Sequence, residues 1–368
     1  MEPSSTPEEP EDPIVSLLQT YNELNSPLIE ELYEVPSALE FMRYVALNRP
    51  FVVRGGAQDW EATKSWDVGT LKKLLEGQSV NVAVTPEGYV LEKLRYWEDE
   101  GWTDMGDRNA DSPTRNEDGE LLFVKPWEEQ QPFNEFVDFV AKQEKEGRND
   151  LEVRYAQTRV FHVIHSLTPS FSNFHSSFSF EKITDQNTEN DNLRNEYSTL
   201  FSHVEKDISW ARIALRQQPE AINLWIGNSR SVTALHKDNY ENIYVQVIGQ
   251  KHFVLLPPLA YPCITEKELP PASYIRSSNS NLEIQKEDGD KVPFATWDPD
   301  SKEDGNEEKE YERFARPVRV TLEKGDMLYL PAMWYHKVSQ SCSEEGICCA
   351  ANYWLVVYTA LRGSLLII

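Results

Sequence analysis

The chain has 368 residues, enough to bury a large core, and its 40% hydrophobic and 11% aromatic content is typical of a folded protein. Its formal net charge of −25 opposes binding to nucleic-acid phosphates and anionic membrane surfaces, so we expect a protein or peptide partner, or a charge that serves solubility alone. Four cysteines without a CxxC pair, no apolar leader and no apolar run of about 20 residues predict a cytoplasmic or nuclear protein.

The first 150 residues contain predicted helices and short strands that follow an acidic tail. Residues 1–13 are rich in Pro and Glu and are predicted to be a disordered tail ahead of an N-terminal region over 14–150. Ser37 and Glu40 have the spacing of a helix capping box, which predicts a helix over about 37–48. The other predicted elements here are strands at 51–54, 79–84 and 152–155, helices around 71–75 and 133–140, and an irregular acidic loop at 98–120.

The segment 159–186 is rich in Ser, Phe and His and has neither a strand period nor a helix period. It holds three of the seven histidines, which are His162, His165 and His175. Their spacing lacks a repeat and their neighbours are apolar. We therefore interpret the segment as an inserted loop rather than as a metal site.

Short strands dominate the sequence from about residue 221 onward. The Gly249-Gln250 pair predicts a two-residue type II′ hairpin between the strands on either side. With a charged insertion near 276–313, this succession predicts a mainly β, α+β fold in which residues 151–358 form a double-stranded β-helix, or jelly roll, flanked by helices. The predicted strands are 222–226, 231–236, 242–248, 251–256, 318–322, 327–338 and 346–357.

His236-Lys237-Asp238 is an H-x-D motif, and the first and third side chains of such a motif point to the same face of a strand. One imidazole and one carboxylate can therefore bind the same metal ion. A second histidine, His336, ends the alternating stretch 326–336 and would complete a facial triad that leaves coordination positions open. This set of two histidines and one carboxylate is the signature of non-haem Fe(II) oxygenases, although Mn or Zn would bind the same atoms.

The H-x-D motif alone is weak evidence for a metal site. A chain with 7 histidines and 61 acidic residues also contains His203-Val-Glu205, which has the same spacing in a polar setting. His236 could instead be a core histidine whose nitrogens are hydrogen-bonded to the protein. The residues around His236 decide between these interpretations.

Three residues near the motif favour a binding site for a dicarboxylate. Lys251 follows His236 by fifteen residues, in the strand expected to pair with 242–248, and a lysine inside a barrel needs an anion to offset its desolvation. The distal carboxylate of 2-oxoglutarate would be such an anion. Thr233 and Asn242 could donate hydrogen bonds to carboxylate oxygens. The alternative is that Lys251 extends to the surface along its aliphatic stem.

The residues 223–258, 325–338 and 351–354 closely resemble the Jumonji-C hydroxylases, and 49–60 with 79–89 resemble the N-terminal part of the same group. The resemblance covers most of 30–355 and implies a cupin jelly roll. Within this family, the sequence is most similar to the lysyl hydroxylases that act on developmentally regulated GTP-binding proteins. Some descriptions also give those enzymes a peptidase activity.

Carried over residue by residue, the resemblance implies an iron site and a 2-oxoglutarate site. The implied iron ligands are His236, Asp238 and His336. The implied contacts to 2-oxoglutarate are Lys251, Thr233 and the Tyr155 hydroxyl at the far carboxylate, with Asn242 and Asn352 near the metal-chelating end.

The activity that the resemblance implies uses Fe(II), 2-oxoglutarate and O2 to hydroxylate a protein, with lysyl C-3 as the implied position and succinate and CO2 as the other products. The implied partner is a protein or peptide substrate such as a GTP-binding protein. The final residues 355–368 depart from the family pattern that supports dimerisation, so a homodimer is left open. No membrane or nucleic-acid partner is expected.

Three alternatives share the same motif. A lysine demethylase would use the same chemistry on an N-methyl group, but the sequence contains no cysteine-rich zinc-finger module that would read histones. A metal-dependent peptidase would need a carboxylate beside a metal-bound water, and no motif places one. A cupin-like binding module without catalysis is disfavoured by the intact triad and Lys251.

Overall fold

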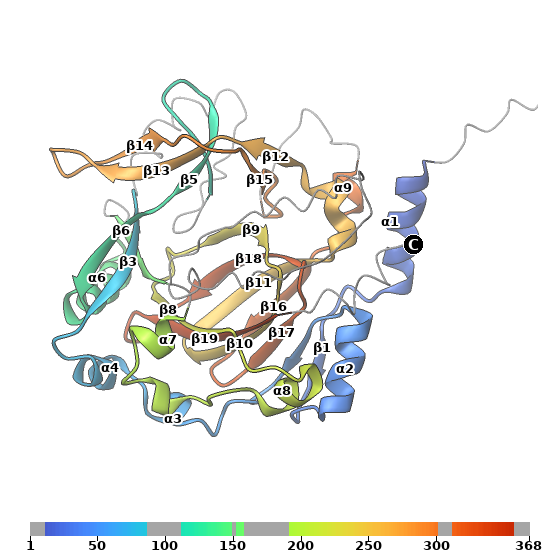
Figure 1. The fold of residues 1–368 in the computed structure, drawn as a ribbon, viewed down its shortest axis with the longest axis horizontal. Coiled ribbons are helices and arrows are strands. Elements are labelled where there is room, and N and C mark those ends of the chain that lie inside the picture. The colour runs from blue at the N-terminus through green and yellow to red at the C-terminus, as the bar shows by residue number, and fades with distance from the viewer. Residues whose placement is uncertain (1–11, 87–111, 149–151, 158–190, 301–310, 357–368) are drawn as a thin grey trace, which may run out of the picture.

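The structure, a computed structural model, describes residues 12–86, 112–148, 152–157, 191–300 and 311–356. It confirms a mainly β jelly roll with flanking helices, in which a nine-stranded major sheet and a four-stranded minor sheet form the two walls (Figure 1). The major sheet has the order β1 (Glu30–Leu32), β2 (Phe51–Val53), β17 (Met327–Leu330), β10 (Tyr240–Ile248), β19 (Cys348–Val356), β8 (Ala221–Gly227), β7 (Val153–Ala156), β3 (Ser79–Thr85) and β6 (Trp127–Pro132). The minor sheet has the order β16 (Val318–Leu322), β11 (Gln250–Leu256), β18 (Tyr335–Ser341) and β9 (Thr233–Lys237).

A second layer of strands lies beside the barrel and is drawn across the top of Figure 1. We call its four-stranded part the cap sheet. Its order is β14 (Leu282–Lys286), β13 (Pro271–Arg276), β5 (Leu121–Lys125) and β4 (Ser112–Arg115), and the pair β12 (Glu266–Leu269) and β15 (Val292–Ala295) lies next to it.

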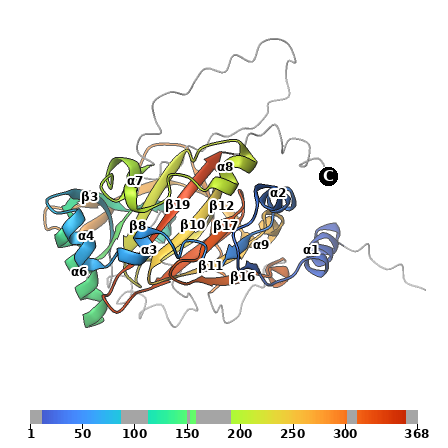
Figure 2. The same cartoon turned by 90° about the horizontal axis from the view of Figure 1, so that it is seen from below.

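Helices cover the outer face of the major sheet, as Figure 2 shows for α3, α7 and α8. A large apolar cluster fills the space between them and the sheet, and a smaller one, which includes Tyr244, Phe253 and Leu328, lies between the two sheets. No helix in the described ranges is long and apolar enough to cross a membrane. The helices are α1 (Pro13–Leu24), α2 (Ala38–Leu47), α3 (Glu61–Ser65), α4 (Val68–Leu74), α6 (Phe133–Glu146), α7 (Asn192–Asn195), α8 (Ser209–Leu215) and α9 (Tyr261–Ile264).

A local signal places the start of α2 correctly, whereas α4, expected around 71–75, begins at Val68. The capping box predicted for α2 is present, because Glu40 N donates to Ser37 Oγ at 3.2 Å and Ser37 N donates to Glu40 Oε2 at 2.8 Å. Helix α1 begins at Pro13 with Asp12 as its N-cap, so the described chain starts just inside the segment predicted as a tail. Residues 1–11 lie outside the described residues.

The predicted hairpin at Gly249-Gln250 is wrong. Strand β10 pairs with β17 and β19 in the major sheet, whereas β11 pairs with β16 and β18 in the minor sheet. Gly249 has φ +71°, and it carries the chain from one wall of the barrel to the other. The local sequence of a tight turn between two apolar strands does not reveal whether the strands pair with each other or join different sheets.

The predicted strand 327–338 is wrong in the same way. It is divided into β17 in the major sheet and β18 in the minor sheet, with a turn between them. The turn contains Pro331, which has no N–H to donate to a ladder, and Met333, which has φ +68°. His336, which follows the turn, therefore lies on the minor sheet, whereas the residues that precede the turn lie on the major sheet.

The predicted acidic loop at 98–120 is partly wrong. Residues 87–111 are not described, but β4 pairs with β5 in register Arg115↔Leu121. The polar segment that forms β4 is therefore stabilised as a strand by hydrogen bonds to its neighbour. The insertion predicted near 276–313 contains β14 and β15, with 301–310 outside the described residues. The segment predicted as a loop at 159–186 and the chain end beyond residue 356 also lie outside the described residues.

Candidate metal centre

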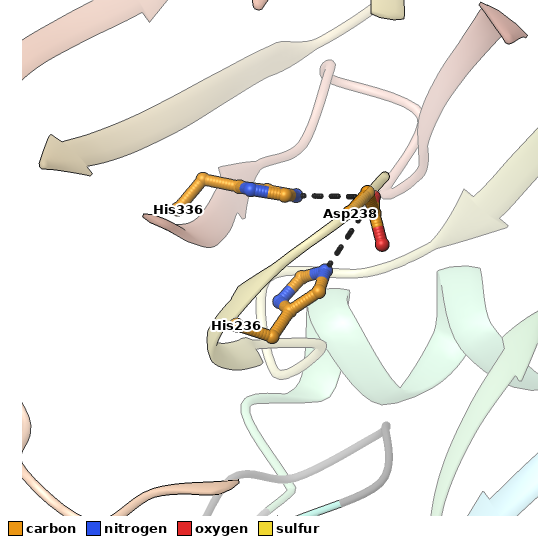
Figure 3. Close-up of side chains that lie close together, drawn as sticks. All are labelled: His236, Asp238 and His336. Atoms are coloured by element: carbon orange, nitrogen blue, oxygen red, sulfur yellow. Dashed lines mark ion pairs between the residues drawn. The ribbon is translucent and has the colours of Figure 1, made fainter. Parts of the chain in front are cut away.

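Two strands of the minor sheet bring His236, Asp238 and His336 together (Figure 3). His236 is on β9, Asp238 follows the end of that strand, and His336 is opposite His236 in the register of β18. His336 Nε2 lies 3.6 Å from Asp238 Oδ2, and His236 Nε2 lies 4.0 Å from the same oxygen. One ligand atom from each residue lies within 4.8 Å of the other two, a spacing that one metal ion can bridge.

The imidazole nitrogens have fixed roles. His236 Nδ1 lies 2.7 Å from Ala234 O, and His336 Nδ1 lies 3.1 Å from Trp334 O. Because a carbonyl oxygen only accepts, each Nδ1 carries the proton and each Nε2 presents a lone pair toward Asp238. Burial and the neighbouring His236 lower the pKa of His336 to about 4, so its imidazole is neutral at physiological pH. This donor set fits a divalent transition metal.

Lys251 lies deep in the barrel on β11. Its side chain is buried, and its ammonium donates a 2.7 Å hydrogen bond to the Tyr155 hydroxyl. In the described part of the chain no carboxylate forms an ion pair with it, and burial lowers its pKa. A buried amine without an anionic partner is costly, so this position suits the carboxylate of a bound ligand.

All eight residues that the sequence singled out line a single pocket of about 390 Å³. That volume is in the ordinary range for small-molecule sites. Besides Lys251 and the triad, the lining includes residues of the cap sheet, β6, β15 and β19, and we call the part that they form the outer pocket. The eight residues are Tyr155, Thr233, His236, Asp238, Asn242, Lys251, His336 and Asn352.

Thr233 reaches this pocket because of an irregularity in β9. His336 pairs with His236 and Val338 pairs with Thr233, so three steps along β9 match two steps along β18. This extra residue is a β-bulge, which changes the alternation of side chains along one strand. Without it, two residues separated by three positions would point to opposite faces of the sheet.

The two asparagines form a hydrogen-bonded chain with a tryptophan that the sequence did not single out. Trp225 Nε1 donates to Asn352 Oδ1 at 2.8 Å, and Asn352 Nδ2 donates to Asn242 Oδ1 at 3.1 Å. Trp225 also stacks on Tyr155 with ring centroids 6.0 Å apart. Alternation from Asn242 would have found another wall residue, Tyr244, but Trp225 carries no local signal of its role.

Aromatic residues of the outer pocket were also missed. Trp127, Tyr274 and Phe294 come from β6, β13 and β15, and Trp354 comes from β19. Two of these strands lie in the segment predicted as an insertion or at its edge, where no motif connects them with the barrel. Only the folded chain brings them to the pocket.

Comparison with known proteins places these features in a family. The sequence matches the family model of the cupin-like domain over residues 36–356. It is 31% identical over 336 residues to the human bifunctional peptidase and (3S)-lysyl hydroxylase JMJD7, which covers 90% of this chain and 85% of that protein. It is 29% identical over 341 residues to JmjC domain-containing protein E of Dictyostelium discoideum, with 88% and 83% covered. It is 31% identical over 336 residues to the lysine-specific demethylase JMJ32 of Arabidopsis thaliana, with 89% and 81% covered.

Proposed function

The chain belongs to the cupin-like JmjC family, and on that premise we propose that it is an Fe(II)- and 2-oxoglutarate-dependent protein hydroxylase. The observation that carries the proposal is that a His-Asp-His triad lines the same pocket as the buried Lys251, which forms no ion pair with a carboxylate of the described residues. A metal alone would not need a buried lysine. The buried lysine is explained if the ligand that binds the metal also carries a second negative charge, which pairs with Lys251.

His236, Asp238 and His336 would hold the iron, with open positions on the side facing the pocket. When bound, Fe(II) would supply the oxidative chemistry, in which O2 and 2-oxoglutarate give succinate, CO2 and a hydroxylated C–H position. The two Nε2 lone pairs are directed toward Asp238 because each Nδ1 donates to a backbone carbonyl, Ala234 O for His236 and Trp334 O for His336. With the oxidative chemistry supplied by the metal, the protein would need no general base of its own.

Lys251, Tyr155 and Thr233 would bind the distal carboxylate of 2-oxoglutarate. The Tyr155 hydroxyl accepts from Lys251 Nζ, and it would turn its own proton from the neighbouring Tyr244 hydroxyl to a carboxylate oxygen of the ligand. An ion pair with Lys251 would offset the cost of burying the amine. The dicarboxylate is thereby oriented, with its other end toward the triad and toward Asn242 and Asn352.

We propose a protein lysine as the substrate, at C-3, within a GTP-binding protein. The name of the human relative supports a lysyl hydroxylase. Trp127, Tyr274 and Phe294 in the outer pocket would pack against the aliphatic stem of a lysine and exclude water from the reacting carbon. The negative net charge of the chain favours a basic segment around that lysine.

A lysine demethylase is the second candidate, because the Arabidopsis relative carries that name at a similar identity. It would use the same residues and would differ in the carbon that is oxidised. A metal-dependent peptidase is the third, because the human protein is also named a peptidase.

The test is a reaction of the purified protein with Fe(II), ascorbate, 2-oxoglutarate and a lysine-containing peptide from a GTP-binding protein, unmodified or N-methylated. We expect mass spectrometry to detect one added oxygen on the unmodified lysine, with succinate formed in step and measured by NMR. His236→Ala, or removal of metal by a chelator, should abolish both signals.

The products separate the candidates. Loss of a methyl group from the methylated peptide, with the unmodified peptide left intact, would replace the hydroxylase by the demethylase. Peptide cleavage that proceeds without 2-oxoglutarate would replace both by the peptidase.

A further inference from the structure

The outer face of the minor sheet carries a hydrogen-bonded cluster directly behind the metal triad. We call it the Lys237 cluster, and its members are Lys237 on β9, Tyr335 on β18 and Glu266 on β12. Lys237 forms an ion pair with Glu266 and donates a 2.8 Å hydrogen bond to the Tyr335 hydroxyl. Tyr335 donates to Glu266 Oε1 at 2.6 Å. Each pair in the cluster is therefore bonded, and the three residues form a closed ring of contacts.

The strand register relates this cluster to the triad. Tyr335 is opposite Lys237, and the next pair along the two strands is His336 opposite His236. Successive side chains point to opposite faces of a sheet. Lys237 and Tyr335 therefore lie on one face of the minor sheet, and His236 and His336 lie on the other. The contacts between Lys237 and Tyr335 thus connect β9 to β18 one residue away from the ligands.

Asp238 lies immediately beyond the end of β9. Lys237 is the last residue of β9, so the ladder does not hold Asp238 directly. The carbonyl of Asp238 accepts a 2.8 Å hydrogen bond from Met333 N in the turn between β17 and β18. The preceding residue, Lys237, is attached to Tyr335 and Glu266, so the chain is attached both at Asp238 and immediately before it.

The burial of the cluster distinguishes it from an ordinary surface ion pair. The side chains of Lys237 and Glu266 are 29% and 12% exposed, and Tyr335 is buried. Lys237 Nζ also lies 4.7 Å from the Tyr335 ring centroid and 5.5 Å from that of Tyr261. Partly buried ion pairs add little net stability but can fix geometry.

We propose that Lys237, Glu266 and Tyr335 are positioning residues, which hold β9 against β18 so that His236, Asp238 and His336 are spaced to bind one metal ion. This inference rests on the proposed function, because it concerns the same metal site. Residues that orient metal ligands commonly change metal affinity by about 10- to 100-fold when replaced. A purely structural ion pair would change folding stability and leave metal affinity unchanged.

The test measures Mn(II) binding to the metal-free, full-length protein by the electron paramagnetic resonance signal of free Mn(II). We expect Tyr335→Phe and Glu266→Gln to raise the Mn(II) Kd by about tenfold or more. Tyr335→Phe removes a single hydroxyl and keeps the buried ring, so it is the variant best able to fold. Lys237→Arg should retain most of the affinity that Lys237→Met loses, because it can still form the ion pair with Glu266.

Arg194→Gln is the matched control. Arg194 and Asp191 form an ion pair of similar burial, 28% and 16% exposed, outside the pocket lining, and Arg194 also donates to Pro219 O and Glu220 O. Arg194→Gln should lower the Tm, because it leaves the partly buried Asp191 without its cation, and it should leave the Mn(II) Kd unchanged. Binding is measured at a temperature at which thermal unfolding shows every variant to be folded.

Two outcomes overturn the proposal in distinguishable ways. A wild-type Kd for Mn(II) that equals the Kd of His236→Ala would remove the metal site itself, and with it the proposed function. Tight wild-type binding that Tyr335→Phe and Glu266→Gln leave within twofold, with a Tm loss like that of Arg194→Gln, would make the cluster structural only and leave the proposed function intact.

Discussion

Lys251 shows how a single residue can lower stability for the sake of binding. Its ammonium is buried beside the Tyr155 hydroxyl, and no carboxylate of the described chain forms an ion pair with it. Burial lowers its pKa from the ordinary 10.5, so the folded state disfavours the charge that the unfolded chain carries. Such a position is costly in the free protein and becomes favourable when an anion binds.

Replacement of Lys251 by methionine should separate stability from binding. We expect Lys251→Met to raise the Kd for 2-oxoglutarate by about 30-fold or more, because a buried charge pair loses one partner. The same variant without ligand should have a higher Tm at neutral pH, because the buried amine is gone. Calorimetric titration and thermal unfolding measure the two effects.

The pH dependence of that gain has a definite sign. Between the lowered folded-state pKa of Lys251 and 10.5, the unfolded wild-type chain binds more protons than the folded chain, so wild-type stability rises with pH. The Tm advantage of Lys251→Met should therefore shrink as the pH rises through this window. The control is Lys337→Met, which removes an ion pair with Asp298 at 2.6 Å and should lower the Tm at neutral pH. A Tm advantage of Lys251→Met that does not change up to pH 10.5 would contradict the buried charge.

At the scale of elements, the site depends on turns that send consecutive strands to opposite walls. Gly249 connects β10 to β11 with φ +71°, and a Cβ added there would lie 2.5 Å from Ser341 O. Both the left-handed backbone and the close carbonyl exclude a side chain. Lys251 on β11 faces Tyr155 across the barrel because of this crossing.

Gly249→Ala should therefore destabilise the fold by more than the cost of placing an alanine at a positive φ. Gly77 has a similar φ of +75°, but an added Cβ meets nothing within 4 Å, so Gly77→Ala isolates the backbone cost of about 1–2 kcal/mol. We expect Gly249→Ala to cost about 1–3 kcal/mol beyond that, because a backbone carbonyl must move. Urea denaturation of the two variants measures the difference, and equal losses would show that the carbonyl moves freely.

At the scale of the whole molecule, an ion network attaches the cap sheet to the major sheet. Arg276 on β13 donates to Glu152 at 2.6 Å, just before β7, and to Glu129 on β6 at 3.2 Å. The neighbouring residues Tyr274 and Ile275 line the outer pocket. The position of that wall therefore depends on contacts between segments more than 100 residues apart in the sequence.

Arg276→Gln should change substrate binding and spare the metal centre. We expect the KM for the protein substrate to rise by about tenfold while the Kd values for Mn(II) and 2-oxoglutarate stay the same, because only the outer wall shifts. Steady-state kinetics and the two binding titrations test this. The control is Lys286→Gln, which removes an exposed ion pair with Glu120 outside the pocket lining and should leave the KM unchanged. Loss of 2-oxoglutarate affinity in Arg276→Gln would mean that the cap also holds the inner pocket.

The sequence by itself determined the features that depend on neighbouring residues. The capping box of α2 and the alternating strands depend on hydrogen bonds and side-chain directions within a few positions of the chain. Such local features can be predicted from the residues themselves. The H-x-D motif likewise places His236 and Asp238 close together, the first on β9 and the second just past its end. Residues near the motif indicated Thr233, Asn242, Lys251 and His336, and recognition of the family added Tyr155 and Asn352, which lie about 200 positions apart.

Only the tertiary structure decided which sheet each strand joins, because that choice depends on long-range pairing and on no local period. It separated β10 from β11 and divided 327–338 between the two walls. It also made the bulge that turns Thr233 into the pocket, and it brought Trp225 and the cap sheet to the site. Hydrogen bonding and burial across the barrel fix these features, since each of them requires a partner strand that the local sequence does not identify.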